Sequence, residues 1–193
     1  RRIIPLMPAV YAGRVITFGF QYMAGDDVKR SLPFRAKMAR CFLYGAQLGW
    51  VSIDLVMADA GRPEAEFLRN LARARQGAHA WLLDGEFLGE IEPVGEISRL
   101  RGEGTAGSGT WPIDLPAVLA TAWVAKDGTM AVAAVNMSDQ PWKLAFRPPW
   151  SRLDASDAAR AARQPGDQSP RPASVTIALP PRDARVAPVL QAR

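Results

Sequence analysis

The chain has 193 residues, of which 48% are hydrophobic and 22% charged, a composition typical of a folded globular protein rather than a disordered one. It contains no run of about eighteen apolar residues, so we expect no membrane-spanning helix and no membrane partner. The formal net charge of +5 comes mostly from scattered Arg residues that do not alternate with aromatic ones, which favours a solvated basic surface over a nucleic-acid partner.

The first half of the chain alternates between strand-like and helix-like patterns. Apolar runs interrupted by Pro and Gly at 3–11 and 14–20 favour buried strands, or passages from strand to loop. A helical spacing of apolar residues begins after Ser31, a residue type that caps helices, and Gly45 is a stop signal. The branched residues of 49–57 (GWVSIDLVM) then predict a second strand region.

The clearest helix begins at Pro63. Glu residues occupy its first turn and Arg residues come later, an order that suits the helix dipole. Gly77 weakens its interior by about 1 kcal/mol relative to Ala, and we expect the helix to end near Asp84-Gly85. The predicted buried face consists of Phe67, Leu71, Ala74, Ala78 and Trp81. This alternation favours parallel α/β architecture for residues 1–91, although too few strands are present to close a barrel.

Residues 92–193 have the pattern of an antiparallel β domain. Short strand candidates are separated by turns, and Asp127-Gly128 between two apolar runs predicts a hairpin. Residues 151–173 predict a long exposed loop. We therefore expect a small antiparallel β-sandwich whose strands pack against the helix of 63–83. Four tryptophans are interpreted as sandwich core or as residues of the junction between the two parts: Trp111, Trp123, Trp142 and Trp150.

Two sequence motifs resemble known sites but lack their context. Gly102, Gly104 and Gly107 match G-x-G-x-x-G, but the two prolines that follow block the helix that a dinucleotide site needs, so we interpret the segment as a flexible linker. Asn136-Met-Ser138 matches a glycosylation acceptor, a pattern that is common by chance.

Single copies of Cys and His limit the available chemistry. Cys41 is the only cysteine and His79 the only histidine, which excludes an internal disulfide and a Cys/His metal site. Cys41 lies in an apolar helical pattern and is expected to be a buried free thiol, and His79 is expected to have a structural role. We predict no metal and no cofactor, and the compartment stays undetermined.

Acidic and aromatic residues near the predicted strand ends are the remaining candidates. Asp54 and Asp59 lie in or just after a strand, where barrel enzymes place their chemistry, although solvated or capping roles are the simpler alternative. Tyr11, Tyr22 and Trp50 also lie near strand ends. Each either fills space between sheet and helix or stacks on the apolar face of a sugar.

The order of these segments resembles the C-terminal end of large (β/α)-barrel glycoside hydrolases of bacteria. The resemblance is carried by IPLMPAVYAGRVITFGF (4–20), FLYGAQLGW (42–50), FLRNLARARQGAHAWLLDGEFLGEI (67–91) and VTIALPPRDARVAPV (175–189). It implies a retaining or inverting hydrolase whose Asp or Glu catalytic residues lie on earlier barrel strands, upstream of Arg1. No catalytic residue is therefore assigned here. The resemblance leaves a carbohydrate-binding wall, with Tyr11 and Trp50 as stacking groups and Asp54 as a hydroxyl acceptor.

The sequence thus predicts two parts: the last βα units of a TIM-like barrel in residues 1–91, and an accessory antiparallel β-sandwich in residues 92–193. The chain starts without Met and without a signal peptide, and we interpret it as a piece whose structural partner is the missing N-terminal part of its own barrel. We expect the chain alone to be inactive. Two alternatives stay open: a non-catalytic carbohydrate-binding or structural β-sandwich module, and a stand-alone α/β protein of unrelated function.

Overall fold

A computed structural model of the chain describes residues 5–18, 21–22, 31–51, 59, 62–106, 109–156 and 172–189. Its helices are α1 (Leu6–Tyr11), α2 (Ser31–Leu43), α4 (Arg62–Gln76), α5 (His79–Leu82) and α6 (Trp150–Ala155). Its strands are β1 (Gln21–Tyr22), β2 (Trp50–Val51), β3 (Glu86–Ile91), β4 (Pro93–Val94), β5 (Arg99–Ala106), β6 (Gly109–Pro116), β7 (Val118–Val124), β8 (Met130–Asn136), β9 (Trp142–Phe146), β10 (Val175–Leu179) and β11 (Asp183–Pro188). No helix among these residues is long and apolar enough to cross a membrane.

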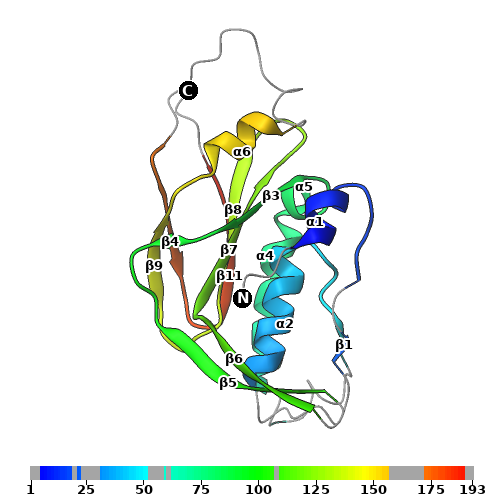
Figure 1. Ribbon diagram of the computed structural model, residues 1–193, viewed down its shortest axis with the longest axis vertical. Helices are drawn as coiled ribbons and strands as arrows, with labels where there is room; N and C mark the ends of the chain where they lie inside the picture. The colour runs from blue at the N-terminus through cyan, green and yellow to red at the C-terminus, as the bar shows by residue number, and fades with distance from the viewer. Residues whose placement is uncertain are drawn as a thin grey trace.

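Most of the strands form two antiparallel sheets. One has the order β11-β8-β7-β3 and the other β10-β9-β4. A cluster of buried side chains from both sheets lies between them, and we call it the inter-sheet core. The opposite face of the four-stranded sheet is covered by α2 and α4, and their common cluster is the helix-side core. The molecule therefore has three layers, with the four-stranded sheet in the middle (Figure 1).

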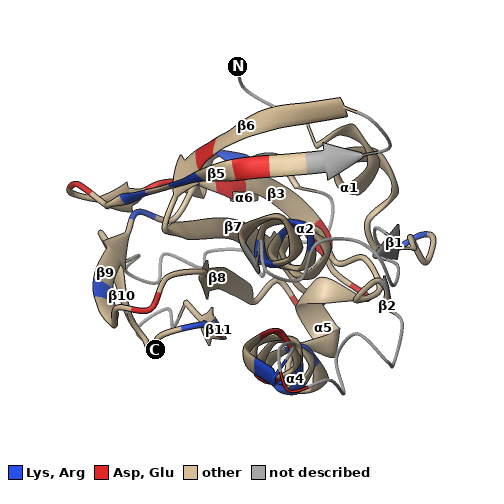
Figure 2. Ribbon diagram, turned by 90° about the horizontal axis from the view of Figure 1, so that it is seen from below, with Lys and Arg blue, Asp and Glu red and all other residues tan. Residues whose placement is uncertain are grey.

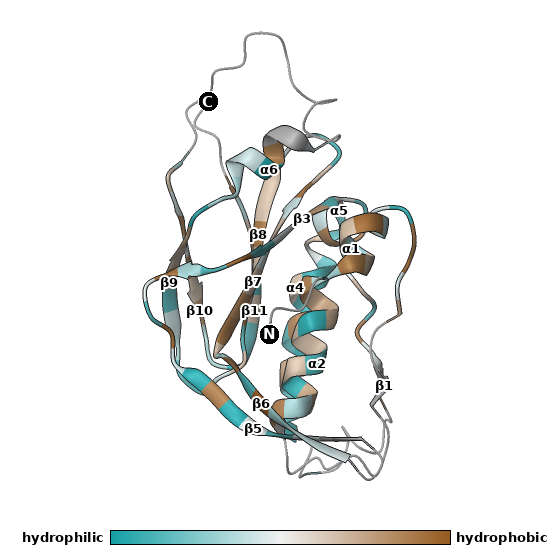
Figure 3. Ribbon diagram, in the orientation of Figure 1, coloured by the Kyte–Doolittle hydropathy of each residue, from teal (hydrophilic) through white to brown (hydrophobic). Residues whose placement is uncertain are grey.

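Strand β8 is buried along its whole length because it contributes to both cores. Successive side chains of a strand point to opposite faces. Accordingly, Val132 and Ala134 lie in the inter-sheet core, whereas Ala133 and Val135 lie in the helix-side core. From Met130 to Val135 the residues of β8 are all apolar, and only the last residue, Asn136, is polar (Figure 3). Strands β7 and β8 also carry no charged residue, whereas charges mark the outer strand β5 (Figure 2).

Helix α2 is held against the sheet at both its ends. Phe34, Met38 and Phe42 recur at intervals of four residues and are fully buried, as a core-facing helical stripe requires. Near the start of the helix, buried Arg35 donates a hydrogen bond to the carbonyl of Met137, just beyond β8. Burial lowers the pKa of Arg35, and Arg182 lowers it further by charge repulsion.

The end of α2 is fixed by hydrogen bonds from the sheet. The carbonyl of Leu43 accepts from Thr121 Oγ1 at 3.1 Å and from Trp123 Nε1 at 3.2 Å. Gly45 follows with a φ of 70°, and a Cβ there would lie 2.3 Å from the carbonyl oxygen of Leu82. Only glycine tolerates both conditions, so the predicted stop signal is confirmed.

Several predicted elements are confirmed. Helices begin at Ser31 and next to Pro63, and Phe67, Leu71 and Ala78 are buried as expected. Helix α4 packs on β11 and α2. The expected end near Asp84-Gly85 is wrong, because α4 ends at Gln76 and a turn at Gly77 and Ala78 separates it from α5.

The predicted hairpin joins β7 to β8. There Gly128 has a φ of 82°, and Asp127 Oδ1 accepts from the backbone N–H of Thr129 at 2.9 Å. Antiparallel sheets are therefore correctly predicted for the second half of the chain.

The structure differs from the sequence interpretation in the region of 3–20. Residues 6–11 form α1 rather than a strand. Pro8 is compatible with this helix because it lies in the first turn, where a backbone N–H has no acceptor within the helix. Described residues 14–18 form no strand, and β1 begins later, at Gln21.

Two segments interpreted as linker or loop are also ordered. Gly102 and Gly104 lie in β5, which forms a long antiparallel hairpin with β6, so the interpretation as a flexible linker is wrong. Residues 150–155 form α6 rather than the start of an exposed loop, because Trp150 and Leu153 pack on the inter-sheet core. The rest of 151–173 lies largely outside the described residues.

The first part contains one parallel βαβ unit. Gln21 and Tyr22 of β1 pair with Trp50 and Val51 of β2 in parallel register, and α2 lies between the two strands in the chain. This agrees with the predicted parallel alternation, although a barrel is not shown. The division at residue 91 stays a prediction. Strand β3 ends at that residue and pairs with β7 in the four-stranded sheet.

Candidate functional site

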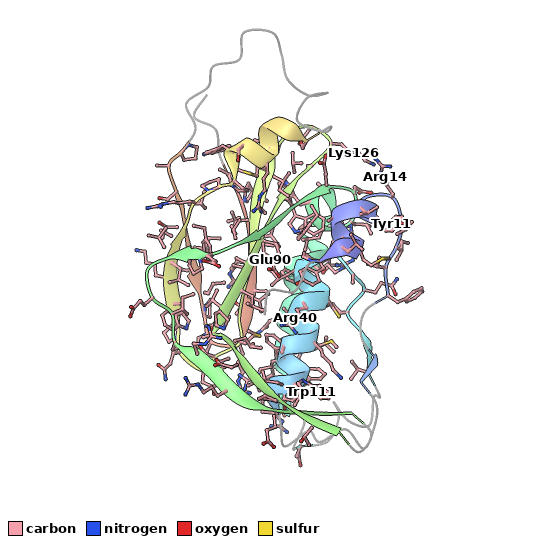
Figure 4. The ribbon with its side chains drawn as sticks, viewed as in Figure 1. Tyr11, Arg14, Arg40, Glu90, Trp111 and Lys126 are labelled. Atoms are coloured by element: carbon pink, nitrogen blue, oxygen red, sulfur yellow. The ribbon has the colours of Figure 1, made fainter. Side chains whose placement is uncertain are left out.

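The three residues predicted to bind substrate are not placed in one described site. Tyr11 is the last residue of α1 and is 44% exposed. Figure 4 shows it on the flank of the molecule near α5, well away from Trp111 on the β5–β6 hairpin. Trp50 begins β2, but its side chain is outside the described part of the chain, and so is Asp54. Their roles in binding stay predictions.

The carboxyl ends of β1 and β2 mark one end of the molecule. Because the two strands are parallel, both ends point the same way, and α2 must start at that end before running back. Figure 1 shows the first turn of α2 next to the β5–β6 hairpin at the bottom of the view. In α/β barrels this end carries the substrate site. Residues 23–30 and 52–58, which follow the two strands, lie outside the description.

Trp111 lies on the hairpin at this same end and is 40% exposed (Figure 4). It shares a face of β6 with Ile113 and Leu115, which are buried in the helix-side core. Directly opposite on β5 is Gly104, where an added Cβ would lie only 2.5 to 2.7 Å from three atoms of the indole ring. The ring therefore covers the glycine on one side.

Sequence reasoning assigned Trp111 to the core or the junction and missed its exposure. One signal was present in the sequence. The alternation of Trp111, Ile113 and Leu115 indicates a strand with one apolar face, and the glycines of 102–107 precede it at hairpin distance. A bulky aromatic opposite a glycine is a common cross-strand arrangement, because the glycine leaves room for the ring.

A separate cleft of about 910 Å³ lies near the other end of α2. Its polar lining includes Arg40 and Tyr44 from the end of α2, Glu90 from β3, and Asp114 from β6. Tyr44 Oη donates to Glu90 Oε1 at 2.6 Å. Burial raises the pKa of Tyr44 well above its usual value, and the bond to Glu90 raises it further, so the phenol stays a donor.

The carboxylates of this cleft are held by neighbouring groups. Asp114 Oδ1 accepts from Arg99 Nε at 2.6 Å, while Glu90 accepts from Tyr44. Arg152 crosses above the bulge at Gly89 and donates to the carbonyls of Leu88 and Glu90. This arrangement offers oriented acceptors and donors to a polar ligand. It shows no pair of carboxylates with assigned acid and nucleophile roles.

The glycosylation match and the single Cys and His residues lie outside the lining of this cleft. Asn136 is fully buried, its Nδ2 donates to the carbonyls of Gln140 at 2.7 Å and Pro180 at 2.8 Å, and its Oδ1 accepts from Ser138. The glycosylation match therefore lies in a buried turn. Cys41 is buried as predicted, and His79 is exposed at the start of α5. Within the described residues, no three Asp, Glu, His or Cys side chains are grouped as metal ligands.

The chain has a glycoside hydrolase-like relationship to curated proteins. It is 34% identical over 143 residues to a protein of Bacteroides thetaiotaomicron named "Putative glycoside hydrolase", a match that covers 74% of this chain and 20% of the relative. It is 38% identical over 53 residues to "Putative glycoside hydrolase 22789" of Monosiga brevicollis, covering 28% of this chain and 4% of that protein. No protein-family model and no solved structure matches the chain.

These matches agree with the resemblance found in the sequence at the level of carbohydrate-active proteins. The chain spans about a fifth of the first relative and a smaller share of the second. Neither match describes a barrel, a catalytic residue or a substrate. The activity of the longer protein to which this chain would belong is therefore a proposal.

Proposed function

We propose that this chain is the C-terminal part of a glycoside hydrolase, combining the last βα units of a TIM-like barrel with an accessory β-sandwich. The observation that carries the proposal is the 34% identity, over 74% of the chain, to a much longer protein named as a glycoside hydrolase. The parallel unit β1–α2–β2, followed by two antiparallel sheets, has the order that the sequence resemblance implies. In this proposal the catalytic Asp or Glu residues lie outside the chain.

A missing barrel portion also accounts for the exposed apolar surface around α1. Seven of the ten exposed large hydrophobic residues in the described part of the chain lie between residues 6 and 18, with exposed fractions of 44% to 66%. They are Leu6, Met7, Val10, Tyr11, Val15, Ile16 and Phe18. So many exposed large apolar side chains in one short stretch of chain are typical of a binding face. We propose that preceding barrel elements cover it.

The proposal is tested with the full-length gene product. We expect it to cleave at least one member of a panel of p-nitrophenyl glycosides and unbranched hexasaccharides, while residues 1–193 alone cleave none. Circular dichroism and a cooperative thermal transition should first establish that both proteins are folded. A folded full-length protein without activity across the panel would count against a hydrolase.

The alternative is a non-catalytic carbohydrate-binding module. It is favoured by features within the chain itself: the cleft lined by Arg40, Tyr44 and Glu90, and the exposed Trp111. Binding of residues 1–193 to a glycan array, combined with an inactive full-length protein, would support this alternative over the hydrolase.

A further inference from the structure

The indole of Trp111 is exposed although its neighbours on the same face of β6 are buried. Ile113 and Leu115 pack in the helix-side core, whereas Trp111 lies beyond the start of α2 and keeps 40% of its surface exposed. Leaving a large aromatic side chain in water forfeits part of the free energy that its burial would contribute. An exposed Trp with a defined position is therefore a candidate for ligand contact.

The position of the ring is defined by the glycines of β5. Gly104 lies under the indole, and a Cβ there would come within 2.5 Å of ring atom Cε2. Gly102, two residue pairs further from the tip of the hairpin, lies under Leu32 of α2, whose Cδ2 would be 3.1 Å from an added Cβ. The two glycines thus place the indole immediately beyond the first turn of α2, with one side against Gly104 and 40% of the residue exposed.

This location is the carboxyl end of the parallel β1–β2 pair. Helix α2 follows β1, so its first turn and the carboxyl ends of both strands lie at the same end of the βαβ unit. In an α/β barrel, substrates bind at that end, in the loops after the strands. The hairpin of the second part of the chain therefore extends to the place where the proposed barrel would hold its substrate (Figure 1).

The chemistry around Trp111 suits a sugar better than an apolar partner. Of the exposed large hydrophobic residues described, Trp111 is the only one on the hairpin. Exposed Thr110, Arg101 and Glu103 lie on the opposite face of the same two strands, because successive side chains of a strand alternate. A single rigid aromatic surface on a hairpin without other exposed large apolar side chains matches a pyranose, which has one apolar C–H face and hydroxyls at its rim. A protein partner would require a larger contiguous apolar patch.

We infer that Trp111 is a carbohydrate-stacking residue, supplied by the β5–β6 hairpin to the substrate-binding end of the barrel. The inference rests on the proposed function and adds to it a specific binding subsite. Gly104 is the positioning residue, because any side chain at that position would displace the indole. Trp111 contacts the sugar ring and takes no part in bond cleavage.

The test measures binding of four hexasaccharides to the full-length protein by isothermal titration calorimetry. The probes are cellohexaose, xylohexaose, mannohexaose and maltohexaose. We expect Trp111→Ala to weaken binding of the preferred sugar about tenfold, the effect of losing one aromatic contact. Trp111→Phe should restore most of the affinity. Gly104→Ala should also weaken binding, since it moves the ring without removing it.

Leu83→Ala is the matched control, because Leu83 is exposed to a similar degree but directly follows α5, near the C-terminal end of α2. It should leave affinity unchanged. Equal affinity of the wild type and both Trp111→Ala and Gly104→Ala would overturn the inference and leave the proposed function intact. A wild-type protein that binds none of the four sugars and cleaves no glycoside would contradict both.

Discussion

At the scale of single residues, Asn136 shows how a sequence motif can have a structural explanation. Its amide bonds to the carbonyls of Gln140 and Pro180, which connects the end of β8 to the turn before β11. Its oxygen receives the backbone N–H of Ser138 at 2.9 Å. The residues that form a glycosylation pattern thus close a buried turn.

Asn136→Ala should lower the free energy of unfolding by about 2 to 4 kcal/mol, because several buried polar groups lose their partners together. Urea denaturation of residues 1–193, followed by tryptophan fluorescence, measures the change. Asn70→Ala is the control: Asn70 Nδ2 makes one hydrogen bond, to the carbonyl of Arg182 at 3.0 Å, so its loss should cost about 1 kcal/mol. Equal effects of the two substitutions would contradict the special role of Asn136.

At the scale of elements, local signals predicted the structure well where neighbours in the chain determine it. The helices that begin at Ser31 and next to Pro63 follow from spacing and capping residues, and the Asp127-Gly128 turn follows from its backbone requirement. Helix α1 was missed because prolines and branched residues imitate a broken strand.

Longer-range partners could not be predicted from the chain. The role of Gly104 depends on Trp111 in the opposite strand, so the glycines looked like a linker. The same limit applies to the candidate site. Aromatics near strand ends were recognised, but neither the exposure of Trp111 nor the contact between Tyr44 and Glu90 has a local signature.

Strand β8 joins the two cores, and this gives a prediction about cooperativity. Val135→Ala opens space in the helix-side core and Val132→Ala in the inter-sheet core. Each should lower stability by about 1 to 3 kcal/mol, as expected for buried aliphatic truncation. Because one strand serves both cores, each variant should still unfold in one transition, with far-ultraviolet circular dichroism and tryptophan fluorescence changing together. Separate transitions would show that the layers unfold independently.

At the scale of the whole molecule, the helical layer and the sheets depend on each other. Residues of the four-stranded sheet that face α2 and α4 include Trp123, Ala133 and Val135, all buried. Removing residues 1–91 would expose this face and delete edge strand β3.

We therefore expect residues 92–193 expressed alone to aggregate or to bind the dye ANS strongly. Residues 1–193 should remain better folded under the same conditions, because the helix-side core is complete. Size-exclusion chromatography with light scattering compares the two. A monomeric, cooperatively melting product of 92–193 would show that the sheets need no helical cover and would support an independent second domain.

The hydrogen bonds that Thr121 and Trp123 make to the carbonyl of Leu43 fix the position of α2 relative to the four-stranded sheet. They stop α2 from sliding along its own axis over the sheet, and Arg35 does the same near the other end. Strands attached to α2 are then held at a constant height relative to the hairpin. The orientation of any β-barrel whose strands are attached to this helix would therefore be set by the antiparallel sheets on which the helix packs.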